Sequence, residues 1–222
     1  MVDSSQGTPA SARTTVHRLA ERGQYDRETI DAILDKARVC HVGFVVDGQP
    51  YVIPTLHVRV GERLILHGAP ANQMLRTLKD GADACVTVTL IDGLVLSRSW
   101  FHTSVNYQSV VVVGRAVEVS DPDEKRAALR ELVEHVVPGR SDDARPPTDA
   151  ELRATLVLAL PLTEASAKVR AGPAKEEPDD VALRHWSGVV PLALQVSAPP
   201  WADADTPADV GVPDYVSRLA GG

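Results

Sequence analysis

The sequence has few cysteines and no long apolar run, and these two absences narrow its class. The two cysteines, Cys40 and Cys85, each lie inside an apolar segment typical of a strand. A secreted disulfide framework needs more cysteines, set in loops, so we expect both to be reduced core residues. No apolar stretch approaches the roughly 20 residues that a membrane-spanning helix needs.

Positive charge is also in deficit. The chain has 23 Lys and Arg against 30 Asp and Glu, which gives a net charge of 23 − 30 = −7. An acidic chain without a basic run argues against binding to nucleic acids or to an anionic membrane surface. Residues 1–23 lack the apolar core of a secretory signal, so we expect a cytoplasmic protein.

Several catalytic and cofactor motifs are missing as well. There is no Gly-x-Ser-x-Gly elbow, no Gly-x-Gly-x-x-Gly turn and no Walker loop, which argues against the common hydrolase, dinucleotide and nucleoside-triphosphate folds. No histidine pair has the i, i+4 spacing of a zinc site. His57 and His67 flank one predicted hairpin, but a one-residue change of register would place them on opposite faces. We therefore expect neither a metal site nor a haem site.

What is present is a series of strands joined by turns. Asp47-Gly48 and Asp92-Gly93 each predict a tight hairpin turn. Apolar and alternating patterns predict strands at 39–46, 51–60, 63–67, 84–91, 94 onward into 110–119, 155–162, 166–170 and 186–196, with 155–162 and 166–170 as neighbours across a turn. Capping residues and apolar faces predict short helices at 26–37, 71–79, 121–137 and 148–153.

These elements predict one domain of a single fold class. Hairpins outnumber crossovers, which excludes a doubly wound parallel sheet. The pattern favours a mainly β (α+β) fold, a closed or split antiparallel β-barrel with short peripheral helices. We place this barrel at residues 25–196, after a flexible N-terminal segment (1–24) and before an irregular C-terminal tail (197–222).

Polar groups gather at the predicted strand ends. Pro54 interrupts a strand, which suits an edge or a barrel rim. Asn72 begins a helix whose free backbone N–H groups suit a phosphate. Tyr107 precedes the long apolar strand, and Lys168 and Arg170 alternate so that both cations can point the same way. Each feature also has a structural interpretation, as a capped helix, a strand-end hydroxyl or a solvated cation.

One ordered set of segments resembles a known family. YVIPTLH is followed by LILHGAP, by DGLVLSRSWFHTSVNYQSVVVVGRA, by ELVEHVVPGR, by SAKVR and by HWSGVVPL. This order resembles the pyridoxamine 5′-phosphate oxidase-like split-barrel flavoproteins, especially the branch with nitroimidazole-resistance proteins and actinobacterial flavin-binding relatives. The resemblance spans residues 15–196.

The resemblance implies a homodimer that binds FMN, or a deazaflavin, in a cleft shared between subunits. It implies an oxidoreductase acting on a small organic substrate, because the flavin carries the redox chemistry of such proteins. His67, His102 and Tyr107 are then the candidate catalytic residues. The flavin contacts that the resemblance implies are Ile53, Pro54, Thr55, Leu56, His67, Gly68, Asn72, Gln73, Tyr107, Gln108, Ser109, Lys168, Arg170 and Trp186.

Three positions depart from the family pattern. Gln73 and Gln108 stand where the family has arginines that grip the FMN phosphate, and Trp100 stands where a small residue is usual. A charge-assisted arginine–phosphate bond is roughly twice as strong as a neutral hydrogen bond. The alternative function is therefore a barrel that has lost FMN and binds another ligand, or performs non-redox acid–base chemistry. A third alternative is a binding or storage module without catalysis.

Overall fold

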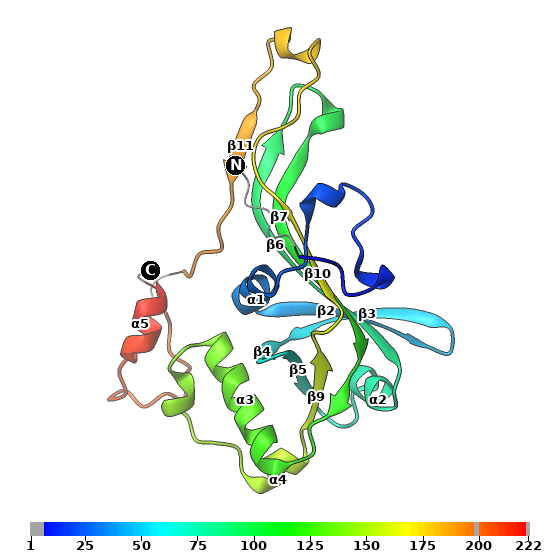
Figure 1. The fold of residues 1–222 in the computed structure, drawn as a ribbon. Coiled ribbons are helices and arrows are strands. Elements are labelled where there is room, and N and C mark those ends of the chain that lie inside the picture. The colour runs from blue at the N-terminus through cyan, green and yellow to red at the C-terminus, as the bar shows by residue number, and fades with distance from the viewer. Residues whose placement is uncertain (1–6, 198–199, 221–222) are drawn as a thin grey trace.

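The computed structural model describes residues 7–197 and 200–220. Its larger sheet is antiparallel, with strand order β1-β10-β7-β6-β2-β3 and with β11 added to β6 (Figure 1). These strands are β1 (Gly23–Gln24), β2 (Val39–Val46), β3 (Gln49–Leu56), β6 (Asp83–Leu96), β7 (Ser104–Arg115), β10 (Ala165–Arg170) and β11 (Gly188–Pro191).

A second, smaller antiparallel sheet has the order β4-β5-β9-β8. Its strands are β4 (Val58–Val60), β5 (Arg63–Gly68), β8 (Val117–Glu118) and β9 (Leu156–Pro161). Alternate side chains of both sheets meet in one core, where Val42, Val86 and Val110 pack with Leu64 and Leu158. The two sheets do not close on each other, so the prediction of a mainly antiparallel split barrel is confirmed.

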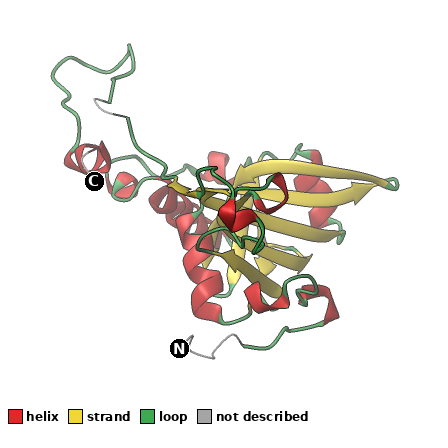
Figure 2. Ribbon diagram, turned by 90° about the horizontal axis from the view of Figure 1, so that it is seen from above, coloured by secondary structure: helices red, strands yellow, loops and turns green. Residues whose placement is uncertain are grey.

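Helices pack against the two sheets, and several begin at the predicted caps. The Asp26 carboxylate accepts a hydrogen bond from Thr29 N at 2.8 Å, and Thr148 forms a capping box with Glu151. Figure 2 shows the strands in layers with helices beside them. The helices are α1 (Arg27–Lys36), α2 (Gln73–Lys79), α3 (Pro122–Val136), α4 (Asp149–Arg153) and α5 (Asp214–Ala220), with 3₁₀ turns η1 (Ala12–Thr14), η2 (Ala20–Arg22), η3 (Trp100–His102), η4 (Arg140–Asp142) and η5 (Asp180–Ala182).

The helix α3 lies against the outer face of the smaller sheet and forms a second apolar cluster with it. Leu132 and Ala128 of α3 pack with Ile65 of β5 and Val157 of β9. Because side chains alternate along a strand, His67 has the same facing as Ile65, toward α3. This placement decides which cavity His67 lines.

The prediction of a hairpin turn at Asp92-Gly93 is wrong. Asp47 and Gly48 do make such a turn, with φ values of 50° and 78°. At Asp92 the strand β6 continues through a bulge instead, with a shift of register between Ile91 and Gly93. A Cβ at Gly93 would lie 3.0 Å from the Val190 carbonyl oxygen, so the glycine is explained by the close approach of β11.

The long β6 and β7 strands therefore form an arm with β11 that extends away from the body (Figure 1). The polar segment before Val110 belongs to β7, which begins at Ser104. The expected strand over 186–196 is confined to β11. Trp100 and Phe101, in the turn between β6 and β7, are 98% and 88% exposed.

The prediction that 166–170 pairs with 155–162 is also wrong. The strand β10 pairs with β1 and β7, whereas β9 pairs with β5 and β8. The short connection between β9 and β10 crosses from one sheet to the other, and Val113 N donates to the Glu164 carbonyl at 3.0 Å. Neighbours in sequence thus lie in different sheets.

Both terminal segments differ from expectation. Within 1–24, the described residues 7–24 include η1, η2 and β1, and β1 pairs with β10. Thr14 is buried and Arg13 pairs with Glu164. The tail is not wholly irregular, because residues 200–213 loop away from the strands and then enter α5 (Figure 2).

The cysteines divide between the two faces of the larger sheet. Cys40 is fully buried, as predicted, and burial raises the pKa of its thiol to about 12. Cys85 is exposed, so its assignment to the core is wrong: on β6 it alternates with the buried Ala84 and Val86. Over the described ranges, no helix combines the length and apolarity needed to cross a membrane.

Candidate functional site

The residues predicted to share one flavin site lie at separate places in this chain. Ile53, Pro54, Thr55 and Leu56 lie on β3, the end strand of the larger sheet. His67 lines one cavity, whereas His102, Tyr107, Lys168 and Arg170 line another. Within one subunit, the predicted flavin-binding residues therefore do not form one site.

The strand β3 is an apolar sheet edge that faces solvent. Within the described residues it pairs only with β2, and Val52 and Ile53 are 64% and 38% exposed. Neighbouring β2 adds exposed Val39 and Val45. Unpaired sheet edges with exposed apolar side chains invite another chain, so this edge is a candidate contact surface rather than a finished site.

The start of α2, where a phosphate site was predicted, is closed by its own residues. The Asn72 Oδ1 accepts from Leu75 N at 3.2 Å, which uses this side chain as the helix cap. Gln73 is exposed. A Cβ at Gly68 would lie 2.9 Å from Leu75 Cδ1, so this glycine permits close packing of β5 on α2. Neither of the two larger cavities is lined by these three residues.

A cavity of about 550 Å³, here called the basic cavity, brings four predicted residues together. Lys168 and Arg170 on β10 do face the same side, as their spacing predicted. Tyr107 lies directly opposite Arg170 in the β7–β10 pairing. The residues that line the basic cavity are Arg18, Leu19, Arg22, Phe101, His102, Thr103, Ser104, Tyr107, Lys168, Arg170 and Lys175.

The charged residues that line the basic cavity are all of one sign, positive. Of the described residues that line it, five are Lys or Arg and none is Asp or Glu. In the described part of the chain, no carboxylate lies within ion-pair distance of Arg22, Lys168 or Arg170. Clefts lined by one sign of charge concentrate ligands of the opposite sign.

Arg170 is the buried member of this group, with only 8% of its surface exposed. Its guanidinium donates to the Asn106 side chain and, at 3.2 Å, to the Pro173 carbonyl oxygen. Burial lowers the pKa of Arg170, and the positive charge of Arg22 lowers it further. A buried cation with neutral partners and a like-charged neighbour is a ready acceptor for an anion.

The N-terminal segment forms one wall of the basic cavity. Lys168 Nζ donates to the Arg18 carbonyl oxygen at 2.7 Å, and β1 pairs Gly23 with Lys168. Between these contacts Leu19 has φ 55° and ψ 56°, the left-handed region that a leucine rarely adopts. The segment is thus held in a specific conformation that presents Arg18 and Arg22 to the cavity.

Gln108, Ser109 and Trp186 do not line the basic cavity. The Gln108 amide donates to Asp92 at 2.8 Å, across the bulge of β6. The Ser109 hydroxyl donates to the Lys168 carbonyl oxygen at 3.2 Å. Trp186 is 65% exposed and lies just before β11 on the arm.

A cavity of about 1090 Å³ lies between α3 and the segment that follows it and is here called the histidine cavity. His67 of β5 lines it together with apolar side chains of α3 that include Leu129, Leu132 and Val133. The imidazole Nδ1 of His67 is buried without a hydrogen-bond partner. Burial lowers the pKa of His67, which favours the neutral imidazole that binds metals.

The rim of the histidine cavity consists of arginine–carboxylate pairs. Arg130 pairs with Asp142 at 3.0 Å and Arg145 with Glu151 at 2.6 Å. The Glu134 carboxylate fixes the loop by accepting from Gly139 N and Ser141 N, both at 2.7 Å, and these bonds lower its pKa to about 2.

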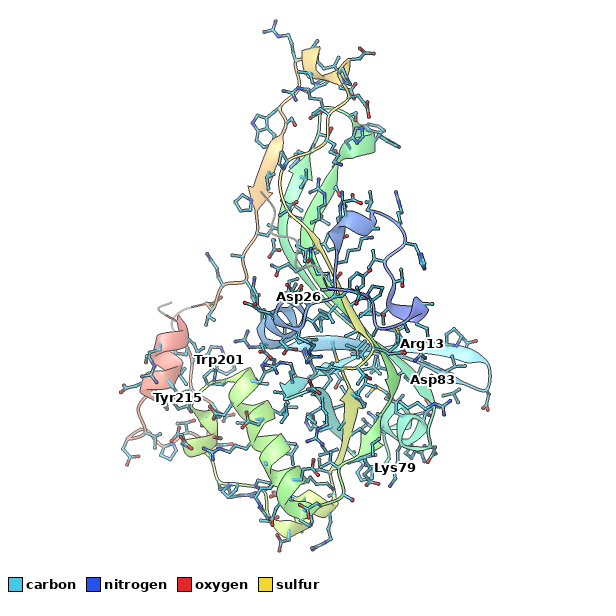
Figure 3. The ribbon with its side chains drawn as sticks, viewed as in Figure 1. Arg13, Asp26, Lys79, Asp83, Trp201 and Tyr215 are labelled. Atoms are coloured by element: carbon cyan, nitrogen blue, oxygen red, sulfur yellow. The ribbon has the colours of Figure 1, made fainter. Side chains whose placement is uncertain are left out.

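The C-terminal helix also reaches this rim (Figure 3). Tyr215 of α5 bridges Arg140 and Asp143, with its hydroxyl 3.0 Å from the Arg140 guanidinium and 2.9 Å from the Asp143 carboxylate. Both partners line the histidine cavity. The tail therefore holds two residues of this wall in place.

His57 does not join His67. It is fully buried between α1 and α3, its Nε2 lies 3.2 Å from the Leu34 carbonyl oxygen, and its ring centroid lies 5.6 Å from that of His135. Burial lowers the pKa of His57 to about 4. Across the described residues, no cluster of three His, Cys, Asp or Glu side chains could hold a metal ion by itself.

Sequence reasoning missed Arg18 and Arg22 in the basic cavity and the arginines around His67. The first two lie in a segment that looked structureless because its apolar residues have no period. The arginines around His67 lie on α3 and in the loop after it, far from β5 along the chain. No local pattern signals either convergence.

Known proteins match this chain both by a family model and by solved structures. The family described as Pyridoxamine 5′-phosphate oxidase matches residues 26–169. The chain is similar to the flavocytochrome Anf3 from Azotobacter vinelandii, with 38% identity, a TM-score of 0.90 and coverage of 96% of this chain and 99% of that one.

A second similar structure is the FAD and haem binding protein from Mycobacterium smegmatis, with 36% identity, a TM-score of 0.85 and coverage of 89% and 97%. A protein assigned to 5-nitroimidazole antibiotic resistance, from Bacteroides thetaiotaomicron, has 26% identity, a TM-score of 0.55 and coverage of 65% and 84%. No curated protein matches the chain.

Proposed function

Since the chain belongs to the pyridoxamine 5′-phosphate oxidase-like family of split-barrel proteins, we propose that it is a flavin-dependent redox protein whose flavin phosphate binds in the basic cavity. One observation carries the placement: among the described residues, five cations and no carboxylate line this cavity, and Arg170 among them is buried. A phosphate would neutralise cations that have no carboxylate partner among the described residues.

The chain's own residues have separate parts in this proposal. Lys168 and Arg170 bind the phosphate, and the Tyr107 hydroxyl and the His102 imidazole lie in the same cavity as groups that can donate a proton. His102 is held by Glu177, 3.1 Å from its Nε2. A bound flavin would supply the one- or two-electron chemistry acting on a small organic substrate. His67 lines the other cavity and has no part in this group.

Both FMN and FAD fit this placement of the phosphate. FMN is the expectation from the family resemblance, and FAD is named for the similar mycobacterial protein. The two glutamines that replace family arginines do not oppose either, because Gln108 is bonded to Asp92 and Gln73 lies away from the basic cavity. The phosphate contacts are supplied by other residues instead.

We further propose a haem site in the histidine cavity, which the histidine spacings did not predict. The volume of about 1090 Å³ is at the upper end of cofactor sites, which reach roughly 1,000 Å³. His67 presents a buried, unpartnered Nδ1 and a neutral imidazole beside an apolar wall, which is what an axial haem ligand needs. Haem propionates would have to exchange with Asp142 and Glu151 as partners of the rim residues Arg130 and Arg145. Two similar proteins, a flavocytochrome and an FAD and haem binding protein, support this proposal.

A homodimer is part of the proposal. The exposed apolar edge of β3 carries Ile53, Pro54, Thr55 and Leu56, which the family resemblance assigns to the flavin. In one subunit Ile53 and Pro54 face solvent, whereas Thr55 and Leu56 are partly buried. All four lie on a different strand from the residues of the basic cavity. A second copy covering this edge would complete a cleft shared between subunits.

The flavin proposal is tested by titrating the flavin-free protein with FMN and with FAD while following the quenching of flavin fluorescence. Arg170→Gln and Lys168→Gln should each weaken binding by roughly tenfold or more, because each removes a charged partner of the phosphate. Arg13→Gln is the matched control, since Arg13 pairs with Glu164 outside the cavity. Absence of binding by either flavin would refute the proposal and favour a barrel that has lost its flavin.

The haem proposal has a separate spectroscopic test. The protein is mixed with haemin and the Soret band is followed for the wild type, His67→Ala and His41→Ala. His41 is an exposed histidine of β2 and serves as the control. We expect His67→Ala alone to lose the band of histidine-ligated haem. Equal spectra for the two variants would exclude His67 as the ligand.

A further inference from the structure

The basic cavity has more recognition elements than a single phosphate needs. Lys168 and Arg170 stand on β10, whereas Arg18 and Arg22 stand on the N-terminal segment that forms another wall. Lys175 adds a fifth cation from the loop after β10. Cations on separate walls fit two phosphoryl groups better than one, because each group can be contacted from its own side.

An aromatic surface accompanies these cations. The Phe101 ring is 88% exposed and still lines the basic cavity, and it contacts the His102 ring edge-to-face with centroids 4.9 Å apart. Tyr107 lines the same cavity. Exposed aromatic rings beside cations are the usual platform for a nucleobase, which stacks on the ring while its phosphates meet the charges.

The N-terminal segment that forms this wall is fixed by specific contacts. The Lys168 contact to the Arg18 carbonyl, the pairing of β1 with β10 and the bond from Val16 N to the Tyr25 hydroxyl at 2.9 Å hold it in place. The left-handed Leu19 between Arg18 and Arg22 is a strained position inside the cavity wall. Strain of this kind concentrates where a segment is held for a ligand.

This wall is outside the residues that the family model matches. The family match covers residues 26–169, so Arg18 and Arg22 precede it and Lys175 follows it. The repulsion of Arg22 that lowers the pKa of Arg170 likewise comes from outside the match. The additional cations therefore come from segments on either side of the matched residues.

From these observations we infer that the N-terminal segment makes the basic cavity selective for a flavin dinucleotide over a mononucleotide. Arg18 and Arg22 bind the second phosphate, the one that belongs to the adenosine half, and Phe101 stacks with the adenine. The inference rests on the proposed function, because it assumes that the flavin phosphate next to the ribityl chain meets Lys168 and Arg170. Arg18, Arg22 and Phe101 then determine specificity and do not take part in the redox chemistry.

The test compares dissociation constants for FAD and FMN in the full-length protein and in the double variant Arg18→Gln/Arg22→Gln. In the wild type we expect FAD to bind at least tenfold more tightly than FMN. In the double variant FAD binding should weaken by on the order of tenfold or more, with FMN binding changed by less than about threefold, because only FAD reaches these arginines. Phe101→Leu should lower the affinity for FAD alone. Arg13→Gln, in the same segment but outside the cavity, should change neither.

Competition by free ADP provides a second measurement. It uses only the wild type, so it does not depend on whether a variant folds. ADP should displace FAD from the wild type at lower concentration than AMP does, because it has the second phosphate. If the wild type binds FMN as tightly as FAD, or the double variant weakens both flavins equally, the selectivity inference is wrong while the flavin proposal stands. If neither flavin binds, both fail. If ADP competes no better than AMP, the second phosphate is not recognised here.

Discussion

The buried His57 makes the stability of the protein depend on pH in a defined window. Its ring is fully buried and lies against the Leu34 carbonyl oxygen, with His135 and Asp35 as the nearest titratable groups. Burial is the largest influence and lowers the pKa from 6.5 to about 4. At about 1.4 kcal/mol per pH unit, this difference corresponds to roughly 3 kcal/mol of unfolding free energy.

The direction in which the unfolding free energy changes with pH follows from proton binding by the folded and unfolded chains. Between pH 6.5 and about 4 the unfolded chain protonates this imidazole while the folded chain does not. The contribution is therefore fully present above pH 6.5, and it is lost progressively as the pH falls toward 4. Replacing His57 by Gln removes the titration and retains a donor for the Leu34 carbonyl oxygen.

Urea unfolding at several pH values measures this effect. The wild type should lose roughly 3 kcal/mol more than His57→Gln between pH 7 and pH 4, after the lower starting stability of the variant is subtracted. His41→Gln is the control, because His41 is an exposed histidine on β2 and its removal should leave the pH dependence unchanged. Parallel pH profiles for the wild type and His57→Gln would refute the assignment.

Two further changes test the local packing. Gly93→Val should destabilise by about 1–3 kcal/mol in urea unfolding, since its Cβ would lie 3.0 Å from the Val190 carbonyl of β11, whereas Gly211→Ala, with open space around it, should be neutral. Asn72→Ala should cost about 1 kcal/mol by removing the cap of α2, and unchanged thermal unfolding relative to exposed Gln73→Ala would contradict that role.

The class of fold could be predicted because local signals agreed with the final structure. Asp47-Gly48 occupies a turn with positive φ at both residues, and Asp26, Asp121 and Thr148 cap helices as their sequence context indicates. The turn prediction at Asp92-Gly93 was wrong because the same residue pair can also occur at a β-bulge. Only the approach of β11, a strand nearly 100 positions later, distinguishes the two cases.

The candidate site was predicted only where strand periodicity determines it. Lys168 and Arg170 share a facing because they are two residues apart on β10, and Tyr107 pairs with Arg170. Arg18 and Arg22 reach the same cavity through a segment without regular periodicity. His67 was expected beside the flavin residues, but its facing on β5 directs it toward α3. Convergence of distant segments depends on tertiary packing, which the sequence pattern does not encode locally.

The proposal that the flavin phosphate binds in the basic cavity is tested most directly by locating this phosphate. A crystal structure of the flavin-loaded protein measures it in one experiment. We predict that the phosphate lies within hydrogen-bond distance of Arg170 and Lys168 in the basic cavity. A phosphate seated instead at the start of α2, beside Asn72 and Gln73, would contradict it.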